Sequence, residues 1–196
     1  CSRRSELLQA QDGLRERYVG TTIGVELALH ARVGDLIAVK SLRDGVASMG
    51  ARYRGWRSVD LLARSYFCQL QGDLEGALEA LETALALAPP LRLTFYTFIA
   101  GAHIKVLLQL GRIASAERHA RIHLTLTEER ELTAPDLYRH AALALALAGD
   151  HAEALRVTER AIERVEQTGA IGFALGVQYE ARARVAIEMN DRPAFE

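Results

Sequence analysis

Two histidines of this chain have the spacing at which helices hold metal ions. His119 and His123 are four residues apart, so on a helix both side chains face the same side. A structural zinc site needs further ligands, and no nearby cysteine or H-E-x-x-H pattern supplies them. The other histidines are dispersed singles: His30, His103, His140 and His151. We therefore expect partly buried structural histidines and no metal ion.

A short cluster of basic and aromatic residues offers groups that can meet phosphates and bases. Its members are Arg52, Tyr53, Arg54, Trp56 and Arg57. The whole chain has 24 basic and 25 acidic residues, so its formal net charge of -1 produces no field that attracts a phosphate backbone. No nucleic-acid-binding motif accompanies the cluster. We expect a segment between helices with Trp56 anchored on the core, and no nucleic acid partner.

The residue patterns of common catalytic sites do not occur in the sequence. There is no phosphate-binding glycine-rich loop and no G-x-S-x-G motif, and neither Cys1 nor Cys68 has a plausible base. Glu128 and Glu129 form a carboxylate pair at an expected helix end, without the apolar pocket that raises the pKa of an acid. We expect no enzymatic activity and no cofactor.

The composition is that of a folded domain in water. Hydrophobic residues make up 49% and charged residues 25% of the 196-residue chain. No apolar stretch approaches the 18 or so residues that span a bilayer, no secretory signal is recognisable, and two cysteines do not make a disulfide framework. We expect a cytoplasmic protein with no membrane partner. Because the chain begins with Cys1, we also expect a segment of a longer polypeptide, and its many arginines and alanines indicate a bacterial source.

Four short breaks of similar composition divide the chain at regular intervals. They centre on Gly34, Gly72, Gly111 and Gly149, which are 38, 39 and 38 residues apart, and Asn190 follows 41 residues later. Glycine and asparagine tolerate the left-handed conformation that ends a helix, and an aspartate directly after the glycine can cap the next helix. Each break therefore predicts a tight turn between two helices.

Amphipathic helical runs flank the breaks. Those before the breaks cover residues 61–71, 96–110, 137–148 and 173–189. Those after the second and fourth breaks carry small or apolar residues on one face: Ala77, Leu81, Ala84 and Ala88, then Ala154, Thr158, Ala161 and Val165. Looser turns are expected at Met49-Gly50, Pro89-Pro90 and Thr168-Gly169. The expected units of one repeat domain are 1–18 (partial), 19–50, 51–90, 91–132, 133–170 and 171–196 (partial).

The second of these units resembles a tetratricopeptide repeat. The resemblance rests on the run Gly72-Asp73-Leu74-Glu75-Gly76-Ala77-Leu78-Glu79 and on Ser65, Ala84 and Pro89 at the family's small-residue and closing-proline positions. The fourth unit matches with Ala142, Ala154 and Ala161, and the third matches less well. The resemblance implies an all-α, right-handed superhelical solenoid of about 4.5 antiparallel helix pairs. The period exceeds the family's usual 34 or so residues, and HEAT repeats, at about 40 to 47, are the alternative by period.

In this family the first helix of each pair lines a concave face that binds extended peptides or partner helices. The resemblance places nine residues there: Leu62, Tyr66, Gln69, Phe98, Lys105, Leu108, Arg139, Leu143 and Leu147. Apolar anchors together with Lys105 and Arg139 suit a peptide that carries a carboxylate. The asparagine and lysine clamp of the chaperone-binding members is missing, because Gly24, Ala28, Leu62 and Tyr66 occupy its places. We therefore do not expect the C-termini of heat-shock chaperones as ligands.

Long repeats of this kind resemble the sensor or adaptor regions of large bacterial regulators. The expected function is thus a non-catalytic protein- or peptide-binding scaffold in signalling. One alternative is a structural or autoregulatory spacer within a multidomain kinase, ATPase or transcription regulator, and another is a small-molecule sensor. A spacer would bury the concave face against neighbouring domains, whereas a scaffold leaves this face open.

The two ends of the expected solenoid lack partner helices. Residues 2–17 have the pattern of a lone second helix. The last full helix should expose Phe173, Val177 and Ile187, which a following helix would cover. We expect these uncapped terminal helices either to support a homodimer or to leave the chain poorly ordered beyond Asn190.

Overall fold

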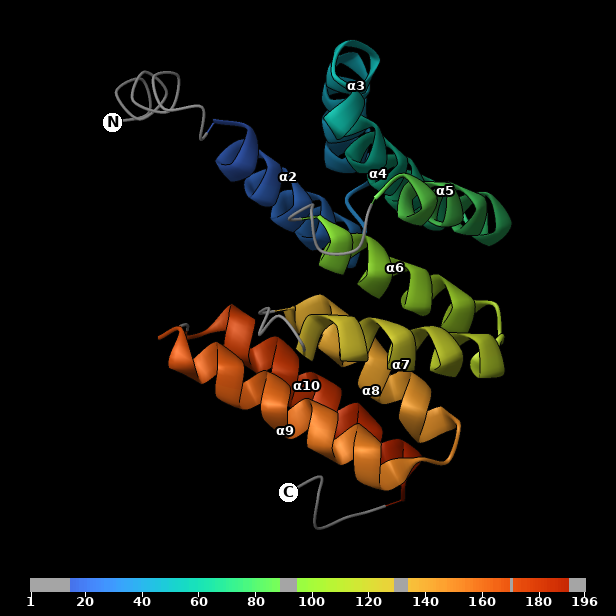
Figure 1. The fold of residues 1–196 in the computed structure, drawn as a ribbon, viewed down its shortest axis with the longest axis vertical. Helices are drawn as coiled ribbons and strands as arrows, with labels where there is room; N and C mark the ends of the chain where they lie inside the picture. The colour runs from blue at the N-terminus through green and yellow to red at the C-terminus, as the bar shows by residue number, and fades with distance from the viewer. Residues whose placement is uncertain (1–14, 89–94, 129–133, 170, 191–196) are drawn as a thin grey trace. The chain divides into compact units, whose positions relative to one another are not determined.

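The fold is all-helical, as the sequence predicts. The computed structural model describes residues 15–88, 95–128, 134–169 and 171–190, and within these ranges no strand is present (Figure 1). The chain divides into two compact units, Cys1–Tyr96 and Thr97–Glu196. Each unit is described by itself below.

The first unit consists of helices that each pack against their neighbours in sequence. They are α2 (Arg15–Arg32), α3 (Leu36–Arg52), the short 3-10 helix η1 (Arg54–Trp56), α4 (Arg57–Leu70) and α5 (Leu74–Leu87). Helix α3 packs against α2 and α4, and α5 packs against α4. In addition α2 contacts α4, so two helices that both precede a tight turn lie next to each other.

The second unit repeats this arrangement. It contains α6 (Tyr96–Gln109), α7 (Ile113–Glu128), α8 (Pro135–Leu147), α9 (His151–Gln167) and α10 (Phe173–Glu188). Only Tyr96, the first residue of α6, belongs to the first unit. Helix α8 contacts α7, α9 and α10, and α9 contacts α10, as Figure 1 shows. Helix α6 approaches the start of α8 closely at Gly101, where an added Cβ would lie 3.0 Å from the backbone nitrogen of Leu137.

The four tight turns share one backbone geometry. Gly34, Gly72, Gly111 and Gly149 have φ angles of 75°, 81°, 71° and 88°, which is the left-handed conformation. After each glycine the next N–H reaches back to a carbonyl of the last helical turn, as in the 2.9 Å bonds from Asp73 to Cys68 and from Asp150 to Leu145. These are Schellman-type helix ends, and they confirm the turns predicted from the sequence.

Aspartates start the helices that follow three of these turns. The side chain of Asp35 accepts a hydrogen bond from the N–H of Ala38 (3.0 Å), Asp73 from Gly76 (2.9 Å) and Asp150 from Glu153 (3.3 Å). Each bond satisfies a backbone donor that has no partner within its own helix. The predicted caps are therefore confirmed, and the first and second helices of a pair are joined with almost no intervening loop.

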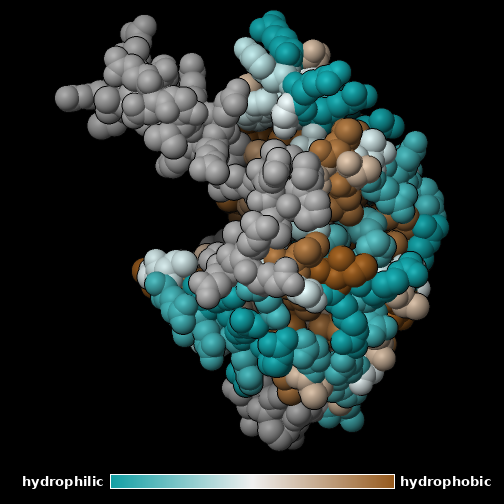
Figure 2. Space-filling model, in the orientation of Figure 1, coloured by the Kyte–Doolittle hydropathy of each residue, from teal (hydrophilic) through white to brown (hydrophobic). Residues whose placement is uncertain are grey.

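The predicted stripes of small and apolar residues are buried. Ala77, Leu81 and Ala84 in α5 have no exposed surface, and Ala154, Thr158, Ala161 and Val165 in α9 are at most 3% exposed. The opposite face of α9 carries charged residues, and it is hydrophilic on the side shown in Figure 2. The helices are thus amphipathic in the register that the sequence predicts.

Two expectations about chain segments need correction. The first pair does not end at Met49-Gly50, because α3 continues to Arg52. Gly50 instead packs against α4, where an added Cβ would lie 3.2 Å from the Cβ of Asp60. Val177 is only 9% exposed because it shares a face of α10 with the buried residues Ala181 and Val185, whereas Ile187 is 62% exposed as expected.

Trp56 anchors the segment between α3 and α4, as predicted. It is 5% exposed, and its ring lies 6.4 Å from that of Phe95 between centroids. Pro89, Pro90 and residues 2–14 lie outside the described residues. None of the described helices is long and apolar enough to cross a membrane.

The buried stripe of α5 predicts that leucine substitutions at two alanines of this helix affect the stability of the protein differently. Ala84 has no exposed surface, so Ala84→Leu should overpack the α4–α5 contact and lower the free energy of unfolding by about 1–3 kcal/mol. Ala86 is exposed, so Ala86→Leu should leave it unchanged within about 0.5 kcal/mol. Urea titrations followed by circular dichroism measure both. Equal stability of the two variants would contradict the register.

The contact between α6 and α8 predicts different effects on stability for alanine substitutions at two glycines. Gly101→Ala places a Cβ 3.0–3.2 Å from backbone atoms of Asp136 and Leu137, which cannot move as a flexible side chain does. We expect a loss of about 1–3 kcal/mol in the free energy of unfolding. Gly176→Ala in α10 meets nothing within 4 Å and should add about 0.5–1 kcal/mol through helix propensity. A stabilising Gly101→Ala would mean that α6 and α8 are not in close contact.

Candidate functional site

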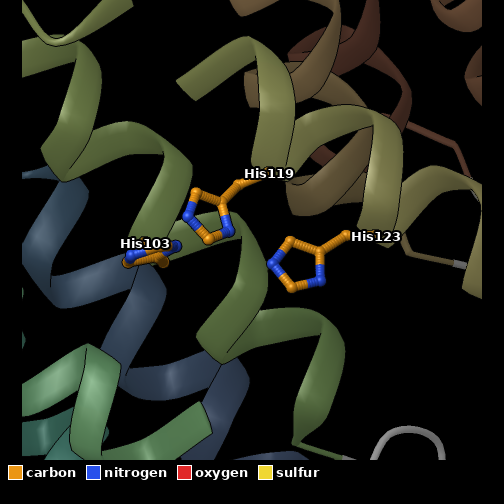
Figure 3. A group of neighbouring side chains, drawn as sticks. All are labelled: His103, His119 and His123. Atoms are coloured by element: carbon orange, nitrogen blue, oxygen red, sulfur yellow. The ribbon is translucent and has the colours of Figure 1, made fainter. Parts of the chain in front are cut away.

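Three histidines of the second unit converge between α6 and α7. The ring of His103 lies 4.6 Å from that of His119 and 6.5 Å from that of His123, and the rings of His119 and His123 are 5.9 Å apart between centroids. Figure 3 shows the imidazole of His119 between the other two, with ring nitrogens turned toward its neighbours. The cluster therefore contains one residue of α6 and two of α7.

The turn at Gly111 brings the three residues together. His103 lies eight residues before this glycine and His119 eight residues after it, so in two antiparallel helices they reach the same level. His123 lies one helical turn beyond His119 on the same face. The expectation that His103 is a dispersed single residue is wrong. Its equal distance from the glycine of the turn is the signal that could have identified it.

Burial keeps two of these imidazoles neutral. His103 is 1% exposed and His123 5% exposed. Desolvation by burial, and secondarily the neighbouring His119 and His123, lower the pKa of His103 to about 3. Burial and the neighbouring His119 lower the pKa of His123 to about 4. At neutral pH both rings are uncharged, so each has a nitrogen lone pair.

The cluster has the donors of a metal site. One ligand atom from each histidine lies within 4.8 Å of the other two, and among the described residues no other set of three or more histidine, cysteine or acidic side chains meets this condition. Neutral imidazole is a ligand for Zn²⁺, Cu²⁺ and Ni²⁺. The sequence-based prediction considered only the α7 pair and lacked the third ligand.

Of the nine residues expected on the concave face, three lie in α4 of the first unit. Leu62 and Tyr66 are 0% and 5% exposed, so they belong to the buried core. Gln69 is half-buried, and neither its amide nitrogen nor its amide oxygen has a hydrogen-bond partner within the protein. The amide atoms of Gln69 are thus buried without a hydrogen-bond partner within the protein.

The other six lie in α6 and α8 of the second unit, and each has some exposed surface. Phe98, Lys105, Leu108, Arg139 and Leu143 are half-buried, and Leu147 is 37% exposed. The close approach at Gly101 puts α6 next to α8. Arg139 is partly neutralised, because it makes a 3.0 Å ion pair with Asp136 one turn earlier.

Buried polar atoms without a protein partner are concentrated in the helices that precede tight turns. Besides Gln69 in α4, they include the Nε of Arg139 in α8 and, in α10, the Oε1 of Gln178 and the Nε of Arg182. Helices α8 and α10 are in contact. Sequence reasoning did not identify Gln178 and Arg182, because a polar residue inside an amphipathic helix gives no signal until its burial is known.

The helices that follow the tight turns differ, because ion pairs join α7 to α9. Arg121 contacts Asp150 at 2.7 Å and Glu117 at 3.0 Å. Arg160 contacts Glu128 at 2.6 Å, and Arg156 bridges Glu128 and Glu153. The hydrogen bond from Arg121 lowers the pKa of Asp150. The charged groups of these ion pairs are thus satisfied within the protein.

No protein-family model matches the chain, and no curated protein matches its sequence.

The lowered histidine pKa values predict acid sensitivity of the metal-free protein. Below about pH 6.5 the unfolded chain binds protons at His103 and His123 that the folded protein does not bind. The free energy of unfolding should therefore fall as the pH drops from 6.5 toward 4, by at most about 1.4 kcal/mol per pH unit for each histidine.

Urea titrations in the presence of a chelator test this between pH 7.5 and 5. His103→Leu should reduce the slope, and the exposed His151→Gln should leave it unchanged. The same slope in His103→Leu as in the wild-type protein would contradict the assignment.

Proposed function

We propose that the chain is a non-catalytic interaction module of the tetratricopeptide type, whose helices before the tight turns bind a segment of a partner protein. In this proposal the pairs stack into a right-handed superhelix. The observation that carries it is the asymmetry between the two kinds of helix. In the second unit, ion pairs join charged side chains of α7 and α9, whereas α8 and α10 hold buried polar atoms with no hydrogen-bond partner in the protein.

An extended peptide has the groups that these atoms require. In the second unit Arg139 and Arg182 offer donors, and Gln178 offers an acceptor. A buried polar atom without a partner costs about 1–3 kcal/mol. Because these atoms are buried in the free protein, their side chains have to turn outward before peptide backbone N–H and C=O groups, or a carboxylate side chain, can pair with them and recover this free energy.

Arg139, Gln178 and Arg182 occupy similar positions along their helices. Arg139 lies ten residues before Gly149, and Gln178 and Arg182 lie twelve and eight residues before Asn190. Because α8 and α10 are in contact and each ends at such a turn, these positions correspond. In this proposal they form a row of donors and an acceptor across two adjacent helices.

Apolar side chains accompany this row. Leu143 and Leu147 in α8 and Phe98 and Leu108 in α6 each have exposed surface. Partly exposed aromatic and aliphatic residues beside a few buried polar groups are the composition of peptide-binding surfaces. The favoured ligand is therefore a peptide with apolar anchors and hydrogen-bonding groups between them.

The test uses a random-peptide phage library as the probe. Peptides selected on the wild-type protein should bind Leu147→Glu and Lys105→Glu at least about tenfold more weakly, which is about 1.4 kcal/mol. Ile122→Glu, at a residue of α7 that is 48% exposed, is the matched control and should bind normally. Circular dichroism checks that each variant is folded.

Two outcomes would instead favour a structural spacer. One is a library that yields no peptide above background. The other is a set of selected peptides whose affinity is the same for Leu147→Glu, Lys105→Glu and Ile122→Glu.

A further inference from the structure

We propose that His103, His119 and His123 form a binding site for a late first-row divalent transition-metal ion, with Zn²⁺ as its representative. The site joins α6 to α7 within the second unit. It does not depend on the proposed function, because it lies between a first and a second helix and uses none of the residues assigned to the peptide surface.

The spacing of the three side chains fits such an ion after small movements. One ligand atom of each histidine lies within 4.8 Å of the other two. Zinc–nitrogen bonds are about 2.0–2.1 Å long, so tetrahedral ligands lie about 3.4 Å apart. Each nitrogen has to move inward by less than about 1 Å, which small rotations of the side-chain torsions provide.

The helix backbones hold the three donors in place before any ion binds. His119 and His123 are one turn apart on α7, and the turn at Gly111 sets His103 opposite them. Little conformational entropy is therefore lost on binding, because the ligands already lie on rigid elements. Three ligands from two helices also avoid the need for a loop to order itself.

An unsatisfied atom within the cluster indicates a missing partner. The Nδ1 of His103 is buried and has no hydrogen-bond partner in the protein, and the residue is 1% exposed. Such an atom destabilises the folded protein if nothing pairs with it. A metal ion accepts the lone pair of a neutral imidazole and would supply the missing partner.

The donor set selects the class of ion. Three imidazoles without a carboxylate in the group do not suit Mg²⁺ or Ca²⁺, which require oxygen ligands. The absence of a thiolate from this group disfavours Cu⁺. Zn²⁺, Co²⁺, Ni²⁺ and Cu²⁺ all accept three nitrogen ligands and a fourth position held by water. His119 is only half-buried, so solvent can reach that position.

Metal binding would tie α6 to α7 by a link stronger than their packing. The ion binds the folded second unit and has lower affinity for an unfolded chain in which the three histidines are apart. Saturating Zn²⁺ should therefore raise the melting temperature of the protein. This shift provides a readout independent of the binding measurement itself.

The experiment uses the whole chain without a polyhistidine tag, stripped of metal by a chelator and dialysed. Calorimetric titration with Zn²⁺ should show one ion per chain with a Kd below about 1 µM. Titration with Co²⁺ should give the visible absorption of a four-coordinate complex. Mg²⁺ at the same concentration should produce no heat of specific binding.

Single substitutions assign the site. His119→Gln should weaken Zn²⁺ binding at least about 100-fold and abolish both the Co²⁺ absorption and the Zn²⁺-dependent rise in melting temperature. Because its side chain is half-buried, this variant should fold even if a variant of the fully buried His103 does not. The exposed His151→Gln is the control and should bind Zn²⁺ as the wild type does.

Two results would overturn the proposal. In the first, the wild-type protein shows no saturable Zn²⁺ binding below about 100 µM. In the second, His119→Gln binds Zn²⁺ with the wild-type affinity, which would place the ion elsewhere, for example at Cys68. Neither result affects the peptide-binding proposal, whose test uses other residues and a different ligand.

Discussion

A left-handed residue at the end of each first helix is the constraint on which the rest of the structure depends. The glycine closes one helix by a bond back to its last turn, and in three of the four turns the aspartate after it caps the next helix. With so short a connection, two helices must run antiparallel and pack on each other. Residues at equal distances from the glycine then meet, which is why His103 lies opposite His119.

Local signals in the sequence predict the tight turns, the aspartate caps that follow them and the buried stripes. Gly72, Asp73 and the alanines of α5 act within a few residues of themselves, so their roles can be inferred without knowing the fold. The predictions that proved wrong concern the end of α3 and the contacts that helices make with one another. Gly50 was expected to end a helix, yet it lies within α3, against Asp60 of the next helix. Val177 and His103 were misjudged because no local pattern specifies which neighbour covers a given face.

Two solutions to the burial of polar groups occur in the second unit. Between α7 and α9 the charges are paired with each other at the surface, where such pairs contribute little to stability but leave no group unsatisfied. In α8 and α10, and at the histidine cluster, polar atoms are buried without such partners. Groups of this second kind cost stability unless water, an ion or a ligand supplies the missing partner. The same chemical asymmetry thus supports both the peptide surface and the metal site, although the two use different residues.

The place of the single tryptophan has a consequence for spectroscopy. Trp56 is buried beside Phe95, and both residues lie in the first unit. Its emission therefore reports the environment of that unit alone, whereas far-ultraviolet circular dichroism samples the helices of both. A difference between the two signals during denaturation would reveal whether the units lose their structure together or in sequence. The chain carries its own probe for cooperativity between its halves, without the need for an attached dye.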